Sequence, residues 1–347
     1  MKRVHRDSAG FSLIEILVGL VIGMLGIIVM MQVFSISEER KRTTTGVGDA
    51  QNNAVVALDG LQRDIAQAGY GFASTKILNC NLLLTSGATV PLAPVIINPG
   101  VAVIPAGDAN TDTLLVAYGN GNGQPEGHIV SSQSGAENTI SATGLLAVGD
   151  LVVVAPDACA GTLRLTPVVA TTAATVTVGT AAAGTNLFNF GAAPRFKAYA
   201  IRNGNLTVCD YGVDDCGEEC AVAGTCSDAW VPIANNVVSL RAQYGHDTSV
   251  PMDAIVDAFN QTTPANACGW MKSVAVRLAL VARSGQLDKE VVTAAAPVWV
   301  GSAGAAIDVS AAPDAAGGFN WQNYRYRVYE TAVPIRNVSW KGVEAGC

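Results

Sequence analysis

Residues 11–36 read FSLIEILVGLVIGMLGIIVMMQVFSI, a long apolar stretch with no proline and a single charged residue, Glu15. As a helix this stretch would be about 39 Å long, enough to cross the roughly 30 Å hydrocarbon core of a bilayer. A carboxylate inside such a helix is costly, so Glu15 predicts a specific partner. The alternative is a lone carboxylate that reaches to the lipid headgroups.

The leader before this stretch, residues 1–10, reads MKRVHRDSAG and is basic. Basic residues on one flank favour the cytoplasmic side, so we expect the C-terminal bulk of the chain to be exported. An ordinary signal peptide or signal anchor is the alternative. Two features argue against a signal peptide. Ala9-Gly10 precedes the apolar stretch rather than following it, and the stretch is longer than a usual signal core.

Residues 10–15, GFSLIE, resemble the processing motif of type IV prepilins, including the pseudopilins of type II secretion. The resemblance implies that a prepilin peptidase cleaves after Gly10 and that the new amino group of Phe11 is methylated. It also implies that the apolar helix is kept as membrane anchor and filament core. In a packed filament, the Phe11 ammonium of a neighbour would then neutralise Glu15.

Two further features of the N-terminal region bear on packing. Gly19 and Gly23 form a GxxxG pattern, which allows helices to approach closely in a membrane or a filament, although helix flexibility explains it equally well. Arg40-Lys41-Arg42 follows the apolar stretch, where contact with lipid headgroups is expected.

The helix is expected to continue over residues 37–70 as an amphipathic helix lying against the exported domain. Apolar residues recur there at spacings of three and four: Val47, Ala50, Ala54, Leu58, Leu61, Ile65 and Ala68. Gly69 and Gly71 should end the helix. Residues 58–72, LDGLQRDIAQAGYGF, resemble the Leu-x-x-Asp-x-x-x-Ala-Gly-Tyr run of PilW-type minor pilins. Structurally, we interpret Ala68-Gly69-Tyr70 as a helix stop followed by an aromatic plug.

Residues 75–195 predict a β-rich lobe, because short β-type runs alternate there with turn residues. The runs are Thr113–Tyr118, Asp150–Ala155, Leu163–Val169 and Thr175–Val178. The sequence GNGNG of residues 119–123 superficially suggests a phosphate loop. It lacks a lysine and a following helix, so we interpret it as a surface turn.

Residues 196–347 carry longer strands: Phe196–Ile201, Leu206–Cys209, Asn236–Tyr244, Met271–Ala282 and Tyr324–Ile335. Together with the helix they predict an α+β fold, a long N-terminal pilin helix packed on an antiparallel sheet with an additional β-rich lobe. The runs SVAVRLALVARS and YRYRVYETAVPIRN resemble PilW-type minor pilins as well. A short helix is expected at Met252–Phe259, after a turn that begins at Gly245.

Eight cysteines in an exported chain are candidates for disulfides, with 105 possible connectivities. Four of them interleave with acidic residues between Cys209 and Asp228. Because these spacings fit neither a zinc ribbon nor a calcium loop, we interpret the region as a disulfide-stapled acidic loop without metal. The predicted pairs are Cys209–Cys226 and Cys216–Cys220, with Cys80–Cys159 and Cys268–Cys347 for the remainder.

Charge and motif content exclude several classes of function. The net charge of −7 becomes −9 without the leader, which argues against nucleic acid as a partner. The chain has three histidines and no catalytic or nucleotide-binding motif, so we predict no enzyme and no cofactor. His128 and His246 are interpreted as loop residues.

The resemblance to PilW-type minor pilins implies a non-catalytic protein that joins a minor-pilin complex and primes type IV pilus assembly. It allows a place at the pilus tip. The implied partners are other minor pilins, the major pilin, the prepilin peptidase and the inner-membrane assembly machinery. The implied location is the bacterial inner membrane, with the bulk in the periplasm, and then the pilus at the cell surface. Two alternatives remain: a J-type minor pseudopilin of type II secretion, and a tip adhesin or other ligand-binding module.

Overall fold

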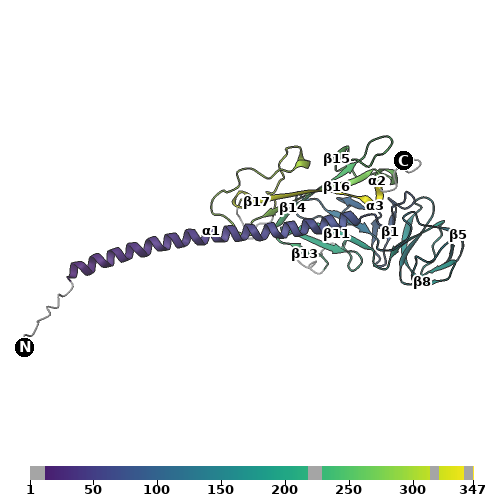
Figure 1. Cartoon of the computed structure of the whole chain (residues 1–347), viewed down its shortest axis with the longest axis horizontal. Helices are drawn as coiled ribbons and strands as arrows, with labels where there is room; N and C mark the ends of the chain where they lie inside the picture. Colours follow the sequence, from purple (N-terminus) through teal and green to yellow (C-terminus); the bar gives the residue numbers. More distant parts are fainter. Residues whose placement is uncertain (1–11, 218–228, 313–319, 340–346) are drawn as a thin grey trace, which may run out of the picture.

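The computed structural model describes residues 12–217, 229–312, 320–339 and 347. One long helix, α1 (Leu13–Gln67), leaves the globular body as a rod and packs on the body with its outer part (Figure 1). Its membrane-length part is exposed all round. A second, β-rich lobe lies at the opposite end of the molecule from the membrane-length part of α1 (Figure 1).

The outer part of α1 buries one apolar stripe, as its spacing predicts. The buried residues are Ala54, Ala57, Leu58, Leu61, Ile65 and Ala68. The helix ends at Gln67, and Gly69 then takes a φ of +81°, a left-handed conformation that favours glycine. The predicted helix stop is therefore confirmed.

The aromatic plug after α1 is a different residue from the one predicted. Tyr70 is 40% exposed, whereas Phe72 is fully buried. Gly69 and Gly71 both have positive φ, and the turns they make at either side of Tyr70 direct Phe72 into the core instead. The Phe72 ring stacks on Phe190, with 5.3 Å between the ring centroids.

Two antiparallel sheets form the body. The first has the order β13-β12-β11-β4-β3, and the second has the order β15-β14-β16-β17. Their bounds are β3 (Val95–Ile97), β4 (Leu114–Tyr118), β11 (Arg195–Arg202), β12 (Asn205–Asp210), β13 (Val231–Ala234), β14 (Val237–His246), β15 (Ala258–Asn260), β16 (Ser273–Arg283) and β17 (Tyr326–Pro334). Helix and sheets together give the predicted α+β fold.

Short helical segments complete the body: α2 (Ala267–Met271), α3 (Arg336–Ser339) and the 3-10 turns η1 (Val300–Ser302) and η2 (Trp321–Asn323). Strands β3 and β4 fall within residues 75–195, yet β4 pairs with β11 of the body and β3 pairs with β4, and neither pairs with a strand of the lobe. Strands of the body and strands of the β-rich lobe therefore alternate along the sequence.

The β-rich lobe is built on a closed ring of six strands. They are β5 (His128–Ser134), β6 (Glu137–Ile140), β7 (Leu151–Ala155), β8 (Thr162–Thr171), β9 (Thr175–Val178) and β10 (Asn186–Gly191). The ring closes because β8 pairs with β7 and, further along, with β9. β1 (Asn81–Leu83) and β2 (Thr89–Pro91) extend the sheet from the start of β8. The barrel core contains Ile140, Leu146, Val152, Val154, Val168, Val176, Val178 and Leu187.

Strands β7 and β10 join the barrel to the body because both of their faces are buried. Successive side chains of a strand point to opposite faces. Val152 therefore belongs to the barrel core and Val153 to the main core of the body. Phe190 of β10 likewise belongs to the main core, where it meets Phe72.

Residues 119–123 form an irregular segment in which Asn120 and Asn122 are exposed, as a surface turn predicts, but Gly119 and Gly121 are buried in a tight seam between barrel and body. Gly119 N donates to Tyr70 O at 2.7 Å, and Asn120 N donates to Phe190 O at 2.8 Å. A Cβ at Gly119 would lie only 2.8 Å from Phe190 O. Glycine is required there because two backbone segments approach so closely. We call residues 119–123 the glycine seam.

Candidate functional site

The N-terminal part of α1 has the length and composition of a membrane span over Leu13–Glu38, and among the described residues it is the one helix that does. Glu15 lies in its first turn with an exposed side chain. A Cβ at Gly19 or Gly23 would meet nothing within 4 Å, so this surface is open in the isolated chain. The predicted cleavage site, Gly10, and methylation site, Phe11, lie outside the described residues.

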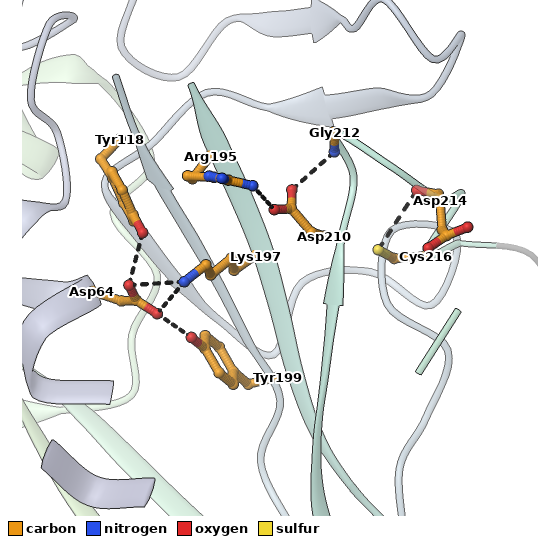
Figure 2. A network of polar contacts seen from close by, with 9 residues as sticks. All are labelled: Asp64, Tyr118, Arg195, Lys197, Tyr199, Asp210, Gly212, Asp214 and Cys216. Atoms are coloured by element: carbon orange, nitrogen blue, oxygen red, sulfur yellow. Dashed lines mark hydrogen bonds and ion pairs between the residues drawn. The ribbon is translucent and has the colours of Figure 1, made fainter. Parts of the chain in front are cut away.

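A buried carboxylate fixes the outer part of α1 to the body (Figure 2). Asp64 accepts a hydrogen bond from Tyr118 Oη at 2.7 Å, and a second one from the hydroxyl of Tyr199. Lys197 Nζ lies 3.1 and 3.0 Å from the two carboxylate oxygens of Asp64. Asp64 comes from α1, whereas its partners come from β4 and β11, so the cluster joins helix and sheet.

The electrostatics of this cluster keep both tyrosines protonated. Burial, first of all, and then Asp64 raise the pKa of Tyr118 and of Tyr199 well above the ordinary value. Neutral hydroxyls are donors, which the carboxylate requires. The Asp of the Leu-x-x-Asp run thus has a structural role. Reading that run as a helix stop alone missed it, although a carboxylate on the apolar side of an amphipathic helix is itself a signal.

A turn after β12 brings together the two cysteines of the first disulfide in the acidic region. Arg195 donates to Asp210 at 2.8 Å (Figure 2). The backbone N–H groups of Val213 and Asp214 both donate to Asp210 O. This turn brings Cys216 to a Cα–Cα distance of 5.8 Å from Cys209, and the two form a disulfide. The predicted pairs Cys209–Cys226 and Cys216–Cys220 were therefore wrong. Cys220 and Cys226 lie outside the described residues.

The two long-range disulfides agree with the prediction. Cys80 bonds to Cys159, which ties the segment after α1 to the β7–β8 connection of the barrel. Cys268 bonds to Cys347, which ties the C terminus to α2. Lys76, close to the first of these bonds, also forms an ion pair with Asp157 at 3.1 Å.

The loop after β14 forms no helix at Met252–Phe259, so that prediction was wrong. Its backbone N–H groups bond instead to the side chain of Asp247. Asp247 is buried and accepts the N–H groups of Ser249, Asp253 and Ala254. Such side-chain bonds compete with helix formation. No group of three or more His, Cys, Asp or Glu side chains suited to a metal occurs in the described part of the chain.

Both histidines after the leader are strand residues, so their interpretation as loop residues was wrong. His128 begins β5 and is buried, and His246 ends β14. His246 lies 3.2 Å from Asn260 Oδ1 and 3.4 Å from Ser273 Oγ. Ser273 is buried and also donates to Gly269 O, so this contact belongs to the packing of α2 against the sheet.

Comparisons with known proteins match family models to both ends of the chain. Residues 5–31 match the model of the prokaryotic N-terminal methylation motif. Residues 216–337, which include β14, β16 and β17, match the model of the type IV pilus-assembly protein W family. A search of curated proteins returned no match.

One solved structure, a type IV-like pilin from Thermus thermophilus, is similar to this chain over 83% of its length and 96% of the other chain. The sequence identity is 12% and the TM-score is 0.35.

Proposed function

The chain is a type IV pilin-like protein of the PilW type, and on this basis we propose that it joins other minor pilins at the inner membrane and primes assembly of the type IV pilus. Its role is packing rather than catalysis. The partners are other minor pilins, the major pilin and the inner-membrane assembly machinery, after the prepilin peptidase has removed residues 1–10.

The observation that carries this proposal is Glu15, the one charge in residues 12–36 of the exposed apolar helix. A carboxylate in hydrocarbon costs several kcal/mol unless a partner neutralises it. Cleavage after Gly10 would create a new amino group on Phe11, four residues before Glu15 in the sequence. Glu15 of one subunit therefore receives the Phe11 ammonium of its neighbour when the helices pack side by side.

The place of the barrel supports a position at the pilus tip. The barrel lies beyond the outer end of α1, along the direction in which the helix leaves the membrane (Figure 1). A subunit stacked further outward on the same axis would have to occupy the space that the barrel fills. The glycine seam, the Phe72–Phe190 stack and the Cys80–Cys159 disulfide hold the barrel in this position.

The test replaces Glu15 with Ala in the full chain and counts pili while measuring co-purification of partner pilins. For Glu15→Ala we expect the number of pili and the recovery of partner pilins to fall sharply. For Glu15→Asp we expect a smaller fall in both. Gln32→Ala is the matched control because Gln32 is another polar residue of the same exposed helix. Undiminished pili and unchanged co-purification would contradict the proposal. Secretion of exported enzymes, measured in the same strains, separates a pilus role from a J-type pseudopilin role.

Processing is tested separately by the intact mass of the mature protein. The expected mass lacks MKRVHRDSAG and carries one methyl group on Phe11. A retained leader would contradict this part of the proposal. The adhesin alternative gains no support from the described barrel, whose core is filled with aliphatic side chains.

A further inference from the structure

Strand β17 forms a long edge of the second sheet of the body. It has nine residues, and in the described part of the chain it pairs with β16 on one side only. The other strands that end a sheet, β2, β3, β13 and β15, have three or four residues. Proteins normally shorten or interrupt an edge strand, because its unpaired backbone groups attract other strands. β17 has no proline before its last residue, Pro334, so it keeps this capacity.

The register with β16 identifies the backbone groups that point away from the sheet. Just before β17, Ser284 N donates to Arg325 O at 2.8 Å. Along an antiparallel ladder, hydrogen-bonded pairs alternate with non-hydrogen-bonded pairs. The odd-numbered residues of β17 therefore bond to β16, whereas the even-numbered residues direct their N–H and C=O groups outward. Three residues have outward backbone groups that bond to no described residue: Val328, Glu330 and Ala332.

Exposed aliphatic side chains flank this edge on both faces of the sheet. On one face, Val300 N donates to the Glu330 carboxylate at 3.0 Å, and the Val300 side chain is 72% exposed. On the other face, Gln62 of α1 donates to the Thr331 hydroxyl. Val55 lies about two turns before Gln62 on the same side of α1 and is 49% exposed. A strand added to β17 would lie between Val300 and Val55, which favours apolar side chains on both of its faces.

The edge is basic, although the chain as a whole is acidic. Arg327 of β17 and Arg336, two residues after the strand, are both exposed. Neither forms an ion pair with a described residue, whereas Arg325 pairs with Asp288 at 3.2 Å. Charge complementarity therefore favours a partner segment that carries acidic side chains among its apolar ones.

The direction of β17 argues against a second copy of this chain as the partner. β17 lies along the outer part of α1 (Figure 1). Thr331 lies beside Gln62, and further along the chain Asn337 donates to Ala68 O, so β17 runs in the same direction as α1. Two copies that paired their β17 strands antiparallel would point their α1 helices in opposite directions, and both helices could not enter one membrane. Two basic edges would also repel each other.

We propose that the outer edge of β17 binds an extended segment of a different exported protein, which adds a strand to the sheet. The segment pairs its backbone with Val328, Glu330 and Ala332. It presents apolar side chains to Val55 and Val300 and carries an acidic residue beside Arg327. The inference goes beyond the proposed function, which assigns no recognition surface to the globular body.

Hydrogen exchange of the backbone amides distinguishes strand addition from other kinds of contact. The full chain is purified from its own cells with its bound partner and, separately, after production alone. In the chain alone, the amides of Val328, Glu330 and Ala332 should exchange fast, whereas those of Tyr329 and Thr331 are protected by β16. With the partner bound, the three outward amides should exchange about tenfold more slowly or less. Unchanged exchange in the complex, protection in the chain alone, or recovery of no partner would each overturn the proposal.

A photo-crosslinking amino acid at Ala332 of the full chain, in the same cells, identifies the segment. The expected adduct lies in one extended segment of a different exported protein, with acidic residues among apolar ones. The same amino acid at Ile129, which is 72% exposed on the barrel, is the control and should not give this adduct. Adducts with a helix of another protein, with a second copy of this chain or with lipid would overturn the inference, as would no adduct.

Two variants test the backbone and the charge separately. Ala332→Pro removes one outward N–H and no bond to β16, a position at which edge strands tolerate proline. Arg327→Glu reverses the charge beside the partner, and it keeps the test valid if the proline variant fails to fold. Each should lower recovery of the partner about tenfold. Arg164→Glu, at an exposed arginine of the barrel, is the control and should leave recovery unchanged.

The two proposals fail in different ways. If Glu15→Ala abolishes pili while Ala332→Pro and Arg327→Glu both retain the partner, the proposed function stands and the inference about β17 is wrong. If Glu15→Ala leaves pili and co-purification of partner pilins intact while both β17 variants lose their partner, the proposed function fails and strand addition at β17 stands.

Discussion

The Asp64 carboxylate of α1 and the Lys197 ammonium of β11 lie 3.0 Å apart, although 133 residues separate them in the chain. Tyr118 and Tyr199 donate to the same carboxylate. This contact determines how far along the sheet the helix sits and how it is rotated. Because α1 also forms the membrane anchor, the orientation of the whole body relative to the membrane depends on it.

Replacing Asp64 with Asn should destabilise the body by about 2–3 kcal/mol, because Lys197 then loses its counter-charge and one donor loses its acceptor in a mostly buried site. Denaturant unfolding of the detergent-solubilised chain measures this. Asp59→Asn is the control on the same helix. Asp59 pairs with Arg63 at the exposed surface, and such pairs contribute less than about 1 kcal/mol. Equal losses for the two variants would contradict a special role for Asp64.

The connectivity of the cysteines gives a second prediction. Peptide mapping under non-reducing conditions should recover Cys80 with Cys159, Cys209 with Cys216, and Cys268 with Cys347. A peptide joining Cys209 to Cys226 would contradict the turn after β12. Stability measurements add a quantitative check, since the Cys80–Cys159 bond spans 79 residues and the Cys209–Cys216 bond spans 7. Chain entropy predicts that Cys80→Ala/Cys159→Ala costs roughly 2 kcal/mol more than Cys209→Ala/Cys216→Ala.

The sequence predicted those parts of the fold that local spacing decides. The stripe Ala54–Ala68 repeats every three to four residues, so it identifies both the helix and its buried face. The strands β7, β8 and β9 were predicted for the same kind of reason. The pairs Cys80–Cys159 and Cys268–Cys347 were named for the four cysteines outside the acidic region, which allow three pairings, and no local spacing decides among them.

The remaining features depend on contacts between distant residues, which spacing does not encode. Closure of the barrel requires β8 to pair with β9 as well as β7, and no local pattern specifies that. The Cys209–Cys216 bond depends on a backbone turn at Asp210. The role of Asp64 depends on where β4 and β11 place Tyr118 and Lys197. In each case the residue was visible in the sequence but its partner was not.

The glycine seam gives a third prediction. Gly119→Ala should destabilise the join between barrel and body by about 1–3 kcal/mol, because the new Cβ would meet Phe190 O at 2.8 Å and Tyr70 O at 3.0 Å. Gly144→Ala is the control, since a Cβ there meets nothing within 4 Å. Limited proteolysis between the two parts, together with thermal unfolding, measures the effect. Equal tolerance of both substitutions would contradict close packing at the seam.

The barrel also contains a pH-sensitive group. His128 is 4% exposed at the start of β5, and its Nε2 atom has no hydrogen-bond partner in the described structure. Burial lowers the pKa of His128 below its usual value near 6.5. The folded chain therefore keeps this imidazole neutral at a pH at which the unfolded chain already protonates it.

Acid should consequently weaken the barrel. Because the folded pKa of His128 is the lower one, its contribution to the free energy of unfolding is complete above about pH 6.5 and is lost as the pH falls toward the folded value. The unfolding midpoint, measured between about pH 7 and pH 5, should fall more steeply for the native chain than for His128→Leu. If His128→Leu retained the full slope, some other group would be responsible and the role assigned to His128 would be wrong.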